Sequence, residues 1–344
     1  MVVATEATQS ILIYAAILSI MSNHIESLVF EPDIHGQFYI PSLSNSKIGS
    51  LESLRSVVRE GLDLVEDSKL RSFGACALEI LLDHLKVREP FPLLFNGDLF
   101  AVVGLEDGGL RLGLTNYFSF LLTNYLSSDR LWQDAVAKWL PGHVENRDTP
   151  LNASIRSNPL SVHINLVTIV DDSYSVLISH RSNANLNTAG TFSHTAGGSL
   201  ERDDLTNFGD YAIQRAAQRE LKEELGIEVQ IDEIVLSDYF VSSKVLDPIV
   251  VAVAFVPDIS QLRWQRSSET LDASWYNLDD AVEQAARDPL SWHYDTLDDL
   301  SATINALAVG LPLSPGLSLI ESPIEIMNVE SVLRRHSTLK LPLQ

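Results

Sequence analysis

Three glutamates, Glu220, Glu223 and Glu224, lie close together in a segment with a helical pattern. Residues three and four positions apart share one face of an α-helix, so the three carboxylates should be neighbours. Like charges at these spacings repel and cost stability. A hard divalent cation such as Mg²⁺ or Mn²⁺ prefers carboxylate oxygens, together with water and substrate phosphates. The spacing is therefore compatible with a metal site and also with an ordinary solvated acidic face.

The helix that carries these glutamates is expected to run from Asp210 to about Leu225. Asp210 is a favourable N-cap residue, and Gly226 can adopt the left-handed conformation that ends many helices. Apolar residues recur at four-residue steps and predict one buried stripe, formed by Ile213, Ala217, Leu221 and Leu225. The glutamates lie roughly a quarter turn from this stripe, where the helix meets solvent or a cleft.

Strand-like segments rich in β-branched residues surround this helix. They cover residues 162–170, 174–180, 234–241 and 249–256, and helical patterns follow near residues 278–286 and 297–307. The order strand, strand, helix, strand, strand, helix predicts an α/β sandwich whose main helix packs against a mixed sheet.

The segment from Arg219 to Ile227, RELKEELGI, resembles the signature of the Nudix hydrolase family, and the paired glycines Gly197 and Gly198 lie upstream of it. That signature contains R-E-U-x-E-E-x-G-U, in which U is aliphatic, and this sequence matches every fixed position. The resemblance covers residues 160–290 approximately. It implies the Nudix-like α/β/α sandwich with a mixed sheet for this part of the chain.

The resemblance also implies an activity, which is the metal-dependent hydrolysis of a phosphoanhydride bond in a nucleoside diphosphate derivative, as in a pyrophosphatase. By the same resemblance, Glu220, Glu223 and Glu224 bind Mg²⁺ or Mn²⁺, and Arg219 orients a glutamate through a salt bridge. Gly198 would let the backbone approach the site.

Two departures from the family pattern, together with an N-terminal half that has no counterpart in the family, motivate an alternative function. The loop after Glu201 contains an insertion, RDDLTNFG, and Tyr211 stands where an acidic residue is expected. The alternative is a non-catalytic nucleotide-sensing or scaffold protein that keeps the Nudix fold, and calorimetry would show binding without turnover. An isopentenyl-diphosphate isomerase-like activity is a third hypothesis, but in the family it depends on a cysteine that this part of the chain lacks.

Other candidate residues flank the signature. Arg181 ends the second predicted strand, where a guanidinium could hold a substrate phosphate or be an ordinary surface group. Glu269 and Asp272 lie in the loop predicted before Trp275, where family members often place a further metal ligand or base. His194 is interpreted as a structural histidine, because no second histidine lies at ligand spacing.

The chain is expected to divide into three parts. Residues 1–155 should form a separate mixed α+β domain of unknown role, residues 156–310 the Nudix-like domain, and residues 311–344 a Pro-containing C-terminal extension. The segment 141–159, rich in Pro, Asn and Ser, indicates the first boundary. In the N-terminal part, residues 11–20 predict a buried helix, residues 37–40 and 93–105 strands, and residues 51–87 a long helical pattern.

The charge of the chain limits its partners. It has 46 acidic and 24 basic residues and a formal net charge of −22. A nucleic acid polymer or an anionic membrane is a poor partner, because both bind through basic residues. The single cysteine, the absence of basic residues before Lys47 and the short apolar run predict a cytoplasmic protein. The expected partner is a small nucleotide diphosphate substrate, and the oligomeric state stays open, a homodimer included.

Overall fold

The computed structural model describes residues 27–35, 38–41, 47–88, 91, 94–106, 109–143, 145–146, 149–183, 186, 189–208, 211–260 and 262–308. The helix expected at residues 11–20, the extension at residues 311–344 and Asp210 lie outside the described residues.

A seven-stranded mixed sheet is the centre of the C-terminal part. Its strands are β6 (Ser161–Val170), β7 (Ser173–Arg181), β8 (Phe192–Ser193), β9 (Ala196–Ser199), β10 (Ile234–Val241), β11 (Pro248–Phe255) and β12 (Thr270–Asn277). The main order is β10-β11-β6-β7-β12, with β8 paired to β7 and β9 to β6. Strands β6 and β11 pair in parallel, and the other pairs are antiparallel.

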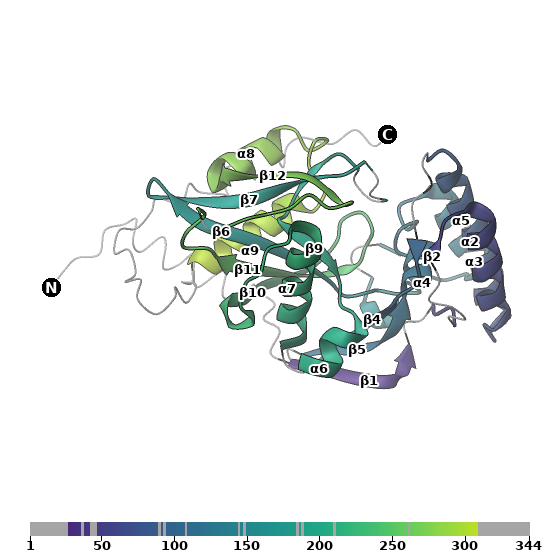
Figure 1. The fold of residues 1–344 in the computed structure, drawn as a ribbon. Helices are drawn as coiled ribbons and strands as arrows, with labels where there is room; N and C mark the ends of the chain where they lie inside the picture. The colour runs from purple at the N-terminus through teal and green to yellow at the C-terminus, as the bar shows by residue number, and fades with distance from the viewer. Residues whose placement is uncertain are drawn as a thin grey trace.

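Helices cover both faces of this sheet (Figure 1). Helix α7 (Ala212–Leu225) packs on one face, and helices α8 (Leu278–Arg287) and α9 (Thr296–Ala308) pack on the other. The first eight residues of β6 are all buried, as expected for a strand with helices on both sides. The predicted α/β/α sandwich with a mixed sheet is therefore confirmed.

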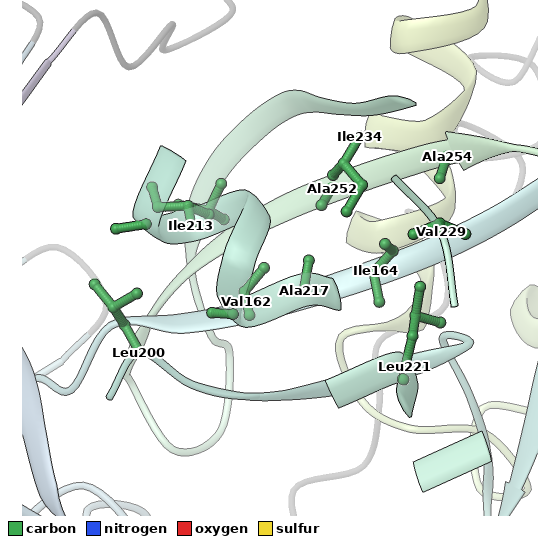
Figure 2. Close-up of a cluster of buried hydrophobic side chains, with 14 of the residues drawn as sticks. Val162, Ile164, Leu200, Ile213, Ala217, Leu221, Val229, Ile234, Ala252 and Ala254 are labelled. Atoms are coloured by element: carbon green, nitrogen blue, oxygen red, sulfur yellow. The ribbon is translucent and has the colours of Figure 1, made fainter. Parts of the chain in front are cut away.

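The apolar stripe of α7 is also confirmed. Its four members, Ile213, Ala217, Leu221 and Leu225, are at most 2% exposed. Figure 2 shows Ile213, Ala217 and Leu221 directed into the cluster that contains Val162 and Ile164 of β6. Because this face is held by the sheet, the adjacent face of α7 has a fixed direction relative to the strands.

The two ends of α7 differ in how well the sequence predicted them. Gly226 has φ 69°, and its amide donates to the carbonyls of Leu221 and Lys222, as expected for a left-handed helix end. The N-cap position, however, is Tyr211, one residue after the predicted Asp210, and the Tyr211 side chain makes no capping bond. The inserted segment forms a short helix, α6 (Arg202–Phe208), so α7 begins at a helix–helix junction rather than after an open loop.

The N-terminal region contains helices and a hairpin separate from the seven-stranded sheet (Figure 1). Its helices are α2 (Leu51–Asp63), α3 (Ser68–Lys86), α4 (Tyr117–Leu122) and α5 (Arg130–Trp139). Strands β1 (Ser27–His35), β5 (Gly109–Asn116) and β4 (Asp98–Glu106) form a sheet in the order β1-β5-β4, and β2 (Lys47–Ile48) pairs with β3 (Leu94–Phe95). Two short 3₁₀ turns cover Leu151–Ala153 and Ile231–Glu233.

Two details of this region differ from the sequence prediction. The pattern at residues 51–87 is two helices, because Asp67 caps the start of α3 through the amides of Lys69 and Leu70. The described residues 38–40 form no strand, although Phe38 and Ile40 are buried. Burial of their side chains explains the apolar pattern without strand pairing.

The hairpin of the N-terminal region packs beside the helix that carries the glutamates. Phe100 of β4 donates a backbone hydrogen bond of 3.1 Å to Leu200 and accepts one of 2.8 Å from Leu160. One hydrophobic cluster joins side chains of β4 and β5 to those of α7. Among the helices in the described ranges, none is both long enough and apolar enough to span a membrane.

Candidate functional site

Glu220 lies against the glycine pair of β9. Glu220 is 9% exposed, and a Cβ atom added to Gly198 would overlap the Glu220 carboxylate. Arg219 donates from Nη1 to Glu220 Oε1 at 2.7 Å. Only glycine leaves room for the carboxylate at this point, so the glycine-rich strand and α7 meet at close range.

Glu224 is held by three elements at once. It is 5% exposed, its Oε1 accepts from the Gly197 amide at 2.9 Å, and its Oε2 accepts from Thr270 Oγ1 at 3.1 Å. The carboxylate therefore links α7 to β9 and to the start of β12.

Glu223 differs from the other two glutamates, because its side chain is 60% exposed. It lies 3.4 Å from Arg219 Nη1, one helical turn away. The helical spacing correctly placed the three residues on neighbouring positions, but β9 covers only two of them.

Arg219 connects several carboxylates. Its Nη2 donates to Asp204 Oδ2 at 3.0 Å and to the Ser199 carbonyl at 2.9 Å, and its Nη1 lies 3.8 Å from Glu201. Burial opposes the charge of the guanidinium, but Glu220 and then Asp204 raise its pKa above the ordinary value. One guanidinium thus faces four carboxylates, those of Glu201, Asp204, Glu220 and Glu223, and the cluster keeps a negative formal charge.

The two buried glutamates are costly to ionise. Burial raises the pKa of Glu220 to about 8, although Arg219 opposes the shift. Burial also raises the pKa of Glu224 to about 7, with Arg181 opposing the shift and Glu269 adding to it. A positive ion beside these carboxylates would favour their charged forms.

A cavity of about 520 Å³ lies next to the glycine pair. Gly197, Gly198, Arg181 and Glu269 line it from the sandwich, and residues of the N-terminal region line it from the opposite side. Its volume is within the range of small-molecule sites, roughly 300 to 1,000 Å³.

The other predicted candidates have different positions relative to the cavity. Arg181 lines it, and its Nε atom is buried without a hydrogen-bond partner among the residues that the structure describes. Glu269 also lines it from the loop before β12. Asp272 does not: it lies within β12 rather than in a loop, paired in register with His180, and it is exposed. The prediction that Asp272 lies in a loop was wrong. Asp272 belongs to strand β12, whose polar sequence did not show a strand pattern.

A histidine cluster that the sequence did not predict lines the same cavity. His194 stacks on His163 with ring centroids 3.7 Å apart and an interplanar angle of 26°, and His293 lies 5.6 Å from His194. Asp299 Oδ1 lies 2.9 Å from His163 Nδ1, and Asp299 Oδ2 lies 3.1 Å from His194 Nδ1. Spacing along the chain gave no signal, because the residues come from β6, the segment just after β8, the segment before α9 and α9 itself, which meet only in the fold.

This cluster is better described as a hydrogen-bond network than as a metal centre. His163, His194 and Asp299 have ligand atoms within 4.8 Å of one another. However, the two stacked ring planes are nearly parallel, 26° apart, so one ion close to both rings cannot lie in the plane of each. Burial lowers the pKa of His194 to about 4. Burial is also the largest influence on His163, but the charge and hydrogen bond of Asp299, together with the charges of Asp295 and Asp247, raise its pKa. Asp299 thus links the two stacked rings, with one carboxylate oxygen at each Nδ1.

Comparison with known proteins identifies this part of the chain. A family model described as NUDIX domain matches residues 159–299. No curated protein sequence matches the chain.

Several solved structures are similar to the sandwich. The NUDIX domain of Shewanella oneidensis NrtR complexed with ADP ribose shares 18% identity, with a TM-score of 0.34, over 50% of this chain and 97% of that chain. A C. elegans Ap4A hydrolase shares 13% identity, with a TM-score of 0.32, over 44% and 98% of the two chains. A MutT NUDIX hydrolase from Burkholderia pseudomallei shares 18% identity, with a TM-score of 0.29, over 42% and 97%. Residues 159–299, with their RELKEELGI helix, are therefore a NUDIX domain.

Proposed function

We propose that the NUDIX domain is a Mg²⁺- or Mn²⁺-dependent hydrolase that cleaves a phosphoanhydride bond in a nucleoside diphosphate derivative. One observation carries the proposal. Glu220 and Glu224 are buried at the Gly197–Gly198 pair, which lines a cavity together with Arg181. Carboxylates that could bind a cation lie behind the glycine pair, and a guanidinium that could bind phosphate lines the same cavity, which supports the proposal.

The residues present fit a divalent cation. Carboxylate oxygens are the ligands that Mg²⁺ and Mn²⁺ prefer, and Glu220, Glu223 and Glu224 would hold the ion. Burial raises the pKa of both buried glutamates, and Arg219 beside Glu220 and Arg181 beside Glu224 oppose the shift only in part. When bound, the ion would draw charge from phosphoryl oxygens and lower the pKa of water.

The protein groups around the cation would orient its ligands, bind the substrate phosphate and accept a proton. Arg219 holds the Glu220 carboxylate in place through the 2.7 Å bond, while Gly197 and Thr270 orient Glu224. Arg181, which lines the cavity, would bind a substrate phosphate through its guanidinium group. Glu269, which also lines the cavity, would accept a proton from the attacking water.

The remaining assignments are also proposals. The chain would act as a cytoplasmic pyrophosphohydrolase on a small-molecule substrate. Residues 1–155 would form a distinct unit, residues 156–310 the catalytic unit, and residues 311–344 an extension.

A substrate screen with two metals tests the function. The full chain is incubated with nucleoside diphosphate sugars, ADP-ribose, dinucleotides, nucleoside triphosphates and coenzyme A in Mg²⁺, Mn²⁺ or EDTA. The proposal expects a phosphate-containing product from at least one compound, and only with metal. Calorimetry that detects nucleotide binding without turnover in either metal would instead support the sensor alternative.

A further inference from the structure

The loop between β10 and β11, residues 242–247, forms part of the cavity wall through Val245 and Asp247. Leu246, between them, has φ 56°, in the left-handed region that bulky side chains rarely adopt. The other non-glycine residues with positive φ in the described ranges are all Asn or Asp. A strained backbone of this kind persists only where surrounding contacts hold it.

Three side chains that precede the NUDIX domain in the sequence hold this loop. Asn124 Nδ2 and Arg156 Nη1 donate to the Leu246 carbonyl at 3.3 Å and 2.7 Å. Ser127 Oγ donates to the Lys244 carbonyl at 3.2 Å. The three donor residues are at most 1% exposed. Because the donors are buried, water replaces a lost bond poorly, and each bond therefore favours the strained conformation of the loop.

Two of these donors are themselves fixed by further buried contacts. The Arg156 guanidinium is paired with Glu145, with Nε 3.0 Å from Oε2, and both side chains are fully buried. Asn124 Oδ1 accepts from the Asn158 amide at 3.1 Å, so both ends of its carboxamide are bonded. Neither donor can turn away from Leu246 without breaking another buried contact.

The same segment of the N-terminal region also lines the cavity directly. Tyr117 and Phe120, on α4, are lining residues, and Asn124 and Ser127 follow in the turn after that helix. One segment therefore forms part of the wall and bonds to a second part of it. Movement of the loop would displace Val245 and change the shape of the cavity.

We propose that the N-terminal region is a positioning element of the NUDIX domain. Asn124, Ser127 and Arg156 hold the β10–β11 loop in its strained conformation and so shape the cavity. Loop opening can be measured with no metal or substrate present, so this role stands or falls separately from the hydrolase function.

Limited trypsin digestion of the full chain measures how often the loop opens. Lys244 is exposed within the loop, but cleavage of the Lys244–Val245 bond requires the loop to leave its anchors. Lys222, exposed on α7, is an internal reference, because cleavage after it requires α7 to unfold. Mass spectrometry of the native digest gives the ratio of the two initial cleavage rates, which separates loop opening from global unfolding.

The variants that remove a donor should raise this ratio. Asn124→Ala should raise it by about 10-fold, because the variant loses a buried bond to the strained residue. Ser127→Ala, which loses only a hydroxyl, should raise it by about threefold or more.

Matched controls are Asn116→Ala and Ser119→Ala. Both residues are fully buried in the N-terminal region, but their side chains bond to groups of that region, such as the Ile40 backbone. These variants should lower the stability of the chain while keeping the ratio within about twofold of the wild-type value.

A ratio that is unchanged in both Asn124→Ala and Ser127→Ala, or that the controls raise equally, would overturn the positioning role. If Asn124→Ala does not fold, the milder Ser127→Ala and its control Ser119→Ala decide the question. A ratio raised only by the donor variants supports the role, whether or not the chain hydrolyses any compound.

Discussion

The Gly197 amide donates a 2.9 Å hydrogen bond to Glu224 Oε1, and this bond joins strand β9 to helix α7. Thr270, at the start of β12, donates to the other oxygen of the same carboxylate at 3.1 Å. Three elements that are distant in sequence therefore fix one side chain at the edge of the cavity. Glu224 is for this reason the most informative residue to change.

Glu224→Gln should remove most of the activity while keeping the fold. The amide oxygen can still accept from Gly197, but the charge that would bind the cation is lost. We expect kcat with Mg²⁺ to fall by at least about 100-fold, more than is typical for a residue behind the metal ligands. Glu228→Gln, an exposed glutamate paired with Lys222, is the matched control and should keep wild-type kinetics. Equal rates for the two variants would show that Glu224 has no catalytic part.

The same substitution should have a pH-dependent effect on stability without metal. Burial raises the pKa of Glu224 from 4.5 to about 7, so the folded state holds this proton more tightly than the unfolded state. The stability of the wild type is therefore lowered by this group as the pH rises from 4.5 to 7. Glu224→Gln lacks this loss and should be more stable than wild type above pH 7, by up to about 3 kcal/mol.

Urea unfolding in EDTA at pH 4.5, 6, 7 and 8 measures this difference. The stability gain of Glu224→Gln over wild type should grow with pH and level off above the folded pKa. A difference that is the same at every pH contradicts the burial of an ionising carboxylate.

Gly198→Ala tests the close approach of β9 to α7. A Cβ atom there would overlap the Glu220 carboxylate and displace it. We expect Mn²⁺ affinity, measured by calorimetry, to fall by about 10-fold or more. Gly49→Ala has no atom within 4 Å of the added Cβ and is the control. Unchanged Mn²⁺ affinity in Gly198→Ala would mean that Glu220 does not need its present position.

Arg181→Lys tests phosphate binding. Lysine keeps the charge but loses the planar fork and the Nε donor, which is unpartnered in the structure. We expect KM for a diphosphate substrate to rise by about 10-fold with a smaller change in kcat. Arg287→Lys, a surface arginine paired with Glu283, should leave both constants unchanged. The reverse pattern, a loss of kcat at constant KM, argues against a role in ground-state binding.

Local sequence patterns predicted the elements that depend on local structure. The four-residue apolar period placed Ile213 and Leu221 in the core, and Gly226 marked the end of α7, because both follow from helix geometry. The β-branched segments marked β6 and β11, which are buried on both faces. Strand β12 was missed because its sequence alternates polar and apolar groups only weakly.

The parts of the site that depend on tertiary contacts could not be predicted. Helical spacing alone predicts the same surroundings for Glu220, Glu223 and Glu224. In the fold, β9 buries two of them and leaves Glu223 exposed. Asp204, from the insertion, contacts Arg219 across a helix–helix junction. Tyr117 lines the cavity from the N-terminal region. Hydrophobic periodicity predicts local elements and carries no information on contacts between distant segments.

The most direct test of the central claim is the rate of phosphoanhydride hydrolysis with and without metal. The full chain and the double variant Glu220→Gln with Glu224→Gln are compared on the best compound from the substrate screen, in Mg²⁺, Mn²⁺ and EDTA. A hydrolase that depends on these two glutamates gives product as wild type with either or both metals, none above background in EDTA, and none as the double variant under any condition. Hydrolysis by the double variant at the wild-type rate, or wild-type hydrolysis that persists in EDTA, would contradict it.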